Sequence, residues 1–150
     1  MSQSLSKLYV HLVFSTRGRE PSLTDILRGG VHEHLATIFR GLGSFALEIN
    51  SEPDHIHILF VLPRTMSLSE VVQKVKSRSS FLIKRLDESI SDFAWQGGYG
   101  GFSVSASRIE GVRRYIRNQR AHHRTHTWKD EYRRWLREYE VEFDDRFVWD

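Results

Sequence analysis

The sequence predicts an α+β fold in which an antiparallel sheet carries its helices mainly on one face. Segments that alternate between hydrophobic and polar residues are interleaved with segments of helical periodicity, in the order β-α-β-β-α-β-α. The chain has 150 residues, of which 39% are hydrophobic and 27% charged, a composition that fills one core. We therefore expect residues 1–150 to form a single domain.

The first half of the chain contains three expected strands and one helix. Residues 8–15 form the first strand, and a helix follows over residues 24–42, weakened in its middle by Gly29 and Gly30. Residues 45–50 alternate as a half-buried strand does, and residues 55–62 form the next strand, which ends at Pro63. The short turn between these two strands predicts a hairpin.

The second half begins with the best-marked helix. Ser67 and Glu70 have the spacing of a capping box, and hydrophobic residues then recur on one face of the helix. A glycine-rich loop leads to a short strand at residues 102–107, and helices are expected at residues 110–122 and 128–139. This order is typical of the split βαβ, or ferredoxin-like, sheet, which RRM domains share.

The first candidate site is the pair His55 and His57. Alternate residues of a strand point to the same face, so both imidazoles project together while Ile56 enters the core. The chain has no cysteine, so a metal site would have to use histidine, carboxylate or amide oxygen ligands. A pair of histidines on a solvated face of the sheet is the alternative interpretation.

The second candidate site is formed by Tyr115 and Gln119, which lie four residues apart in an expected helix and so share one face. Core packing would equally explain the tyrosine. The amide oxygen of Gln119 could bind a metal ion beside the phenol. Because a phenol has a reference pKa of about 10, it is a poor nucleophile at neutral pH unless a cation activates its target.

With these two candidate sites, the chain resembles the single-tyrosine HUH transposases of simple bacterial insertion sequences. Residues 53–59, PDHIHIL, are similar to their His-hydrophobic-His motif, and residues 115–119, YIRNQ, are similar to their Tyr-Ile-x-x-Gln helix. Residues 11–16, 76–80 and 95–99 also match in the right order, so the resemblance covers nearly the whole chain. The tail at residues 143–150 is the least typical part.

The resemblance implies a mechanism in which the catalytic tyrosine lies on a C-terminal helix. His55, His57 and Gln119 would bind Mg²⁺ or Mn²⁺, and Tyr115 would attack a phosphate of single-stranded DNA. The products would be a 5′-phosphotyrosine link and a free 3′-hydroxyl that can rejoin the DNA. The family also implies a homodimer and recognition of hairpins at the ends of the element.

Charge patterning is compatible with a nucleic-acid partner, and a solvated basic helix face is the alternative interpretation. The net charge is +3, and the capped helix carries a basic face that could contact phosphates. The candidates on this face are Lys74, Lys76, Arg78 and Lys84. A second histidine cluster, His122, His123 and His126, is expected to lie on the surface or to face phosphates. With no long apolar stretch and no secretory signal, we expect a cytoplasmic protein without a membrane partner.

Three alternatives remain open at this stage. A noncatalytic RRM-like nucleic-acid-binding module would share the topology, and Tyr99 in its glycine-rich loop would then contact RNA. A metal-dependent hydrolase would use the same histidines with water as its nucleophile. A domesticated relative would keep the transposase chemistry and serve its host.

Overall fold

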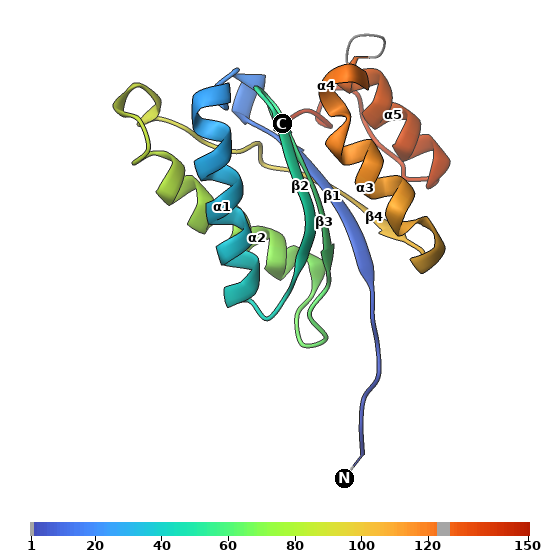
Figure 1. Cartoon of the computed structure of the whole chain (residues 1–150). Helices are drawn as coiled ribbons and strands as arrows, with labels where there is room; N and C mark the ends of the chain where they lie inside the picture. Colours follow the sequence, from blue (N-terminus) through green and yellow to red (C-terminus); the bar gives the residue numbers. More distant parts are fainter. Residues whose placement is uncertain (1, 123–126) are drawn as a thin grey trace.

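The computed structural model describes residues 2–122 and 127–150. Four antiparallel strands form one sheet in the order β2-β3-β1-β4, as Figure 1 shows. The strands are β1 (Tyr9–Ser15), β2 (Ala46–Glu52), β3 (His55–Val61) and β4 (Gly100–Val104). The predicted ferredoxin-like sheet is confirmed, including the β2–β3 hairpin.

One face of the sheet is covered by α1 (Asp25–Gly41) and α2 (Leu68–Ile83) (Figure 1). Their buried residues pack on the even-numbered residues of β1 and β3, such as Leu12 and Ile58. The capping box of α2 is confirmed, because the Ser67 hydroxyl accepts a hydrogen bond from the backbone N–H of Glu70 at 3.1 Å.

The opposite face is covered by helices from the C-terminal third of the chain: α3 (Ile109–Arg117), α4 (Gln119–His122) and α5 (Trp128–Glu138) (Figure 1). We expected the helices to pack mainly on one face, but α1 and α2 cover one face and α3, α4 and α5 cover the other (Figure 1). The second covered face arises because Val13 and Leu59 also point into hydrophobic clusters, with α5 and α3 respectively. None of the helices in the described part of the chain is long and apolar enough to cross a membrane.

Two elements differ in detail from the sequence expectation. The last strand begins at Gly100 rather than Phe102, and a 3₁₀ turn (Ala106–Arg108) follows it. Glycine lies inside this strand because α5 packs directly on its backbone: a Cβ atom at Gly100 would stand 2.5 Å from Cε2 of Tyr132. Further 3₁₀ turns are formed by Arg17–Arg19 and Glu88–Ile90. The helix expected at 110–122 is interrupted at Asn118, where α3 ends and α4 begins.

Candidate functional site

His55 and His57 lie on the face of β3 that α3 and α5 cover. Their ring centroids are 5.3 Å apart, so the two imidazoles stand side by side as the strand periodicity predicts. They are only 2% and 0% exposed, respectively, which excludes the alternative of a solvated sheet face. Burying two histidines together is costly unless their nitrogens are used.

Both imidazoles are held through their Nδ1 atoms. Nδ1 of His55 lies 2.8 Å from Oδ1 of Asp54, and Nδ1 of His57 lies 3.0 Å from Nε2 of His11 on β1. Burial lowers the pKa of His11 to about 4, so the His11 ring is neutral at neutral pH. Because Nδ1 is engaged within the protein, Nε2 is the atom that each ring would offer to a metal ion.

Tyr115 projects from α3 toward His57 and His11. Its ring centroid lies 6.0 Å from that of His57 and 6.3 Å from that of His11. The phenolic hydroxyl donates a hydrogen bond to Oε1 of Glu131 on α5. The structure therefore brings Tyr115 and His57 together within one chain.

The environment of Tyr115 opposes ionisation of its hydroxyl. Burial, first, and the hydrogen bond to Glu131, second, hold the pKa of Tyr115 well above its ordinary value, while the Gln119 side chain acts in the opposite direction. A preformed phenolate is therefore not the resting state of this residue. Any nucleophilic attack by Tyr115 requires a proton acceptor at the hydroxyl.

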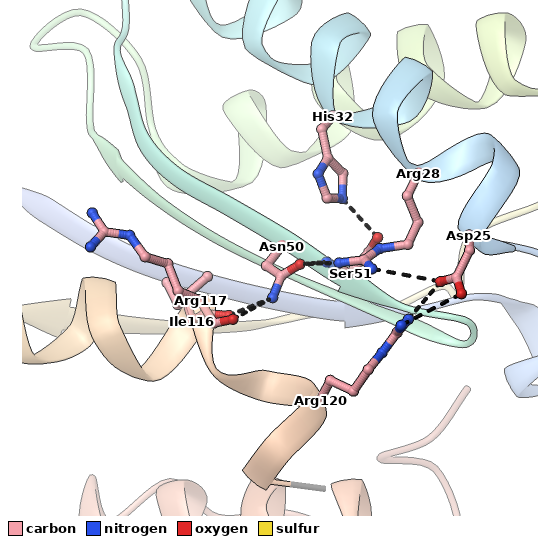
Figure 2. Close-up of polar contacts among 8 residues, drawn as sticks. All are labelled: Asp25, Arg28, His32, Asn50, Ser51, Ile116, Arg117 and Arg120. Carbon is pink, nitrogen blue, oxygen red and sulfur yellow. Dashed lines mark hydrogen bonds and ion pairs between the residues drawn. The ribbon is translucent and has the colours of Figure 1, made fainter.

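Gln119 is fully buried, and its side-chain Nε2 donates to the backbone carbonyl of Tyr115 at 3.2 Å. Its position depends on the interruption between α3 and α4, which Asn50 of β2 stabilises. Nδ2 of Asn50 donates to the carbonyl oxygen of Ile116 at 2.7 Å, satisfying a terminal carbonyl of α3 (Figure 2). The same side chain accepts a hydrogen bond from Arg28 of α1 at 2.5 Å.

Aromatic residues of α5 cover the histidines. The indole of Trp128 stacks on His55 with ring centroids 4.2 Å apart. The ring centroid of Trp135 lies 5.6 Å from that of His57 and 5.2 Å from that of His11. Glu131 lies between these tryptophans in the helix and is 2% exposed. A carboxylate on a buried aromatic face is unusual, because burial of a charge is costly without a partner.

Sequence reasoning did not assign a role to Glu131, Trp128 or Asp54. Glu131 carried a usable signal, because it is an acidic residue at the helical spacing of the hydrophobic residues Trp128 and Trp135. Asp54 precedes the first histidine, but the contact between its carboxylate and Nδ1 depends on the turn between β2 and β3. The stacking of Trp128 on His55 joins residues far apart in the chain, and no sequence pattern indicates it.

The basic residues expected to contact DNA lie on α2 and at its C-cap, across the sheet from Tyr115. Lys74, Arg78 and Lys84 are exposed. Lys76 instead donates hydrogen bonds to the backbone carbonyls of Gln96 at 2.8 Å and Gly98 at 2.5 Å, and burial lowers its pKa to about 8. Lys76 thus anchors the loop before β4. In the second histidine cluster, His123 and His126 lie outside the described residues, as does the side chain of His122.

The chain combines an antiparallel sheet, a buried histidine pair and a tyrosine on a neighbouring helix. These features can be compared with those of known proteins. Two of the solved structures that share its fold are described as transposases. One is a candidate transposase from Deinococcus radiodurans R1, with 22% identity, a TM-score of 0.62, and coverage of 79% of this chain and 98% of that chain. The other is a REP-associated tyrosine transposase bound to a REP hairpin, with 15% identity, a TM-score of 0.59, and coverage of 82% and 74%.

The sequence itself identifies the family. The profile described as "Transposase IS200 like" matches residues 4–119, which include both histidines, Tyr115 and Gln119. The chain therefore belongs to the IS200-like transposase family. Comparison with curated protein sequences found no match.

Proposed function

We propose that this transposase cleaves and rejoins single-stranded DNA with Tyr115 as its nucleophile and a divalent metal ion as its cofactor. The observation that supports this most directly is the packing of Tyr115 against His57, with ring centroids 6.0 Å apart on one covered face of the sheet. Core packing alone would not require a buried histidine pair and a buried glutamate at the tyrosine hydroxyl.

The proposed chemistry is an exchange of phosphodiester bonds. The hydroxyl oxygen of Tyr115 attacks the phosphorus of the scissile phosphate, and the bond from phosphorus to the 3′ oxygen breaks. The DNA is left as a 5′-phosphotyrosine and a free 3′-hydroxyl. A 3′-hydroxyl then attacks the phosphotyrosine, releases Tyr115 and rejoins the strand, so the phosphodiester bond energy is conserved through the covalent link.

Proteins of this family are generally metal-dependent. Within residues 2–122 and 127–150, no group of three or more His, Asp or Glu side chains could hold a metal ion. The proposed site therefore uses His55 and His57 through Nε2 together with the amide oxygen of Gln119, and the Nδ1 contacts of both rings fit this role. A bound Mg²⁺ or Mn²⁺ would polarise the scissile phosphate and stabilise the developing charge.

The proposed DNA partner is a single strand with hairpin-forming ends. The REP-associated neighbour was solved with a REP hairpin, which makes a hairpin a reasonable partner for this chain. The exposed Lys74, Arg78 and Lys84 are proposed to contact its phosphates. We also propose a homodimer, on the basis of the family resemblance. Within one chain, Tyr115 lies beside His57, with ring centroids 6.0 Å apart.

A covalent-adduct assay tests the proposal. Purified protein is incubated with Mg²⁺ and labelled single-stranded DNA that carries the sequences flanking its gene, and the products are resolved on a denaturing gel. We expect a labelled band shifted by the mass of the protein, absent with EDTA and absent for Tyr115→Phe. The matched control is Tyr99→Phe, which removes a phenol from the loop before β4.

Other products would contradict the proposal in distinct ways. Cleaved DNA without an adduct, persisting in Tyr115→Phe, would identify a hydrolase that uses water. Tight binding without cleavage, lost in Tyr99→Ala, would identify a noncatalytic binding module. An adduct that survives EDTA would remove the metal ion from the mechanism.

A further inference from the structure

A cavity of about 720 Å³ opens beside Tyr115 on the side away from α1 and α2. Its walls come from β4, the following 3₁₀ turn, α3 and α5, and the rings of Tyr115 and His11 also line it. The volume lies in the range of roughly 300–1,000 Å³ that is usual for small-ligand sites. A ligand in this cavity would touch the residue that we propose as the nucleophile.

One wall of the cavity is aromatic. It is formed by Phe102, Trp135 and Tyr139. The ring centroids of Phe102 and Tyr139 lie 4.9 Å apart. Tyr139 is 45% exposed, and its hydroxyl donates to the carbonyl oxygen of Ser103 at 2.7 Å, which fixes the ring at the cavity wall. A rigid, half-exposed ring suits stacking with a nucleic-acid base, which tolerates any base sequence.

The same cavity carries two arginines, Arg108 and Arg134. Arg108 is exposed. Arg134 is 51% exposed, and its Nε lies 3.7 Å from Oε1 of Glu138, which is a long ion pair. An exposed pair within one helix contributes little, so this guanidinium can turn toward a phosphate at low cost. Aromatic surface together with arginine is the combination that binds a nucleotide of single-stranded DNA.

Gly111 provides an independent observation. It lies in α3, where glycine costs roughly 1 kcal/mol relative to alanine. No atom of residues 2–122 and 127–150 explains the choice, because a Cβ atom built at Gly111 has none of them within 4 Å. Gly111 does line the cavity, so its missing side chain leaves that wall open for a ligand.

We propose that this cavity binds one nucleotide of the single-stranded substrate, adjacent to the phosphate that Tyr115 attacks, with the base on Tyr139 and the backbone at Arg108 and Arg134. The position of the nucleotide relative to the cleaved phosphate rests on the proposed function. The cavity itself is a binding site separate from the histidine pair and from the basic face of α2.

The test compares DNA binding by variants of the full chain. Fluorescence anisotropy is measured with a fluorescein-labelled single-stranded oligonucleotide that carries the sequence flanking the gene. Gly111→Leu fills the cavity and Tyr139→Ala removes the stacking ring, and each is expected to weaken binding roughly five- to 150-fold. Tyr139→Phe retains the ring but loses the hydrogen bond to Ser103, so it should bind more tightly than Tyr139→Ala.

Two controls exclude loss of folding as the cause. Leucine is a better helix former than glycine, so Gly111→Leu should melt no lower than the wild type. Gly29→Ala makes the same kind of change in α1, where a Cβ atom also has nothing within 4 Å, and it should bind DNA normally. An abasic position moved along the oligonucleotide should weaken wild-type binding at one site and have no further effect there in Tyr139→Ala.

The outcomes separate this inference from the proposed function. If Gly111→Leu and Tyr139→Ala bind like the wild type while the wild type forms the Tyr115 adduct, the cavity is not a nucleotide site and the catalytic proposal stands. Loss of binding in both variants, without any adduct from the wild type, would support the nucleotide site and overturn the catalytic proposal. An equal loss in Gly29→Ala would also overturn the assignment of the cavity.

Discussion

The hydroxyl of Tyr115 donates a hydrogen bond to the carboxylate of Glu131, which is buried on the inner face of α5. The donor comes from the helix that lies on β2 and β3, and the acceptor comes from the helix that covers β1 and β4. The bond leaves the phenolic oxygen with a proton acceptor already in contact. It also gives the buried carboxylate between two tryptophans a hydrogen-bond donor.

The first prediction concerns Glu131→Gln. This change preserves a side-chain oxygen that can accept the hydrogen bond but removes the group that could take the phenolic proton. If Tyr115 is the nucleophile, formation of the covalent adduct should slow by roughly 10²–10⁴-fold, the usual contribution of a general base. Single-turnover adduct formation at saturating DNA measures this rate.

Glu131→Asp and Tyr132→Phe are the matched variants for this prediction. Glu131→Asp should recover part of the rate, and Tyr132→Phe, a change at the next residue of α5, should leave it close to that of the wild type. A Glu131→Gln enzyme as fast as the wild type, or faster, would show that the carboxylate restrains Tyr115 instead of accepting its proton.

Much of the fold and the juxtaposition of His55 and His57 in the candidate site could be predicted from sequence. The His-x-His spacing places both imidazoles on one side of a strand whatever the rest of the fold does, because the side-chain period is two. The start of α2 was indicated by the capping-box residues Ser67 and Glu70, three residues apart. Local rules of this kind need no tertiary information.

The remaining features depend on contacts between distant segments. A helical pattern over residues 110–122 cannot reveal that Asn50 will bond to the carbonyl of Ile116 and stabilise an interruption there. The glycines before Phe102 favour a loop until the packing of Tyr132 on Gly100 is known. Lys76 looked like its exposed neighbours on α2, although its ammonium group bonds to backbone carbonyls of a loop twenty residues away.

The second prediction concerns Asp54→Ala. The carboxylate contacts Nδ1 of His55 at 2.8 Å, and in the proposed metal site this contact would orient Nε2 of that ring toward the ion. Loss of such a contact usually weakens metal binding by roughly 10–100-fold, and we expect that range for Mn²⁺ measured by calorimetry. Asp87→Ala is the control, because Asp87 bonds to a backbone N–H in an exposed turn. Equal Mn²⁺ affinity in wild type and Asp54→Ala would remove Asp54 from the site.

The third prediction concerns pH and His32 of α1. Nε2 of His32 lies 2.7 Å from the hydroxyl of Ser51 (Figure 2), and burial, with a smaller contribution from Arg28, lowers the pKa of His32 from 6.5 to about 4. Between these values the unfolded chain binds a proton that the folded chain does not, so the free energy of unfolding falls as the pH is lowered. Because His32 is partly exposed, its contribution to this fall in the free energy of unfolding is about 1–2 kcal/mol.

Urea unfolding at several pH values, for wild type and His32→Gln, measures this share. The variant keeps a hydrogen-bonding side chain and loses the titrating group, so its stability should fall less between pH 6.5 and pH 4. His11 is present in both proteins and contributes equally to both. Parallel curves for the two proteins over this window would contradict the prediction.

The fourth prediction concerns Asn50→Asp. Asn50 joins three elements, because it accepts from Arg28 of α1 and donates to the carbonyl of Ile116 at the end of α3 (Figure 2). Aspartate preserves the acceptor for Arg28 but places a carboxylate against that carbonyl. We expect a loss of about 1–3 kcal/mol in the free energy of unfolding, the cost of a buried acceptor without its donor.

Asn50→Asp should also affect function, since the end of α3 positions both Tyr115 and the buried Gln119. We expect slower adduct formation and weaker Mn²⁺ binding at temperatures where the variant is fully folded. Arg28→Gln is the matched control, because it breaks the contact on the other side of Asn50 and leaves the bond to Ile116 in place. If Arg28→Gln impairs the adduct as strongly as Asn50→Asp, the site depends on the position of α1 and not on the end of the tyrosine helix.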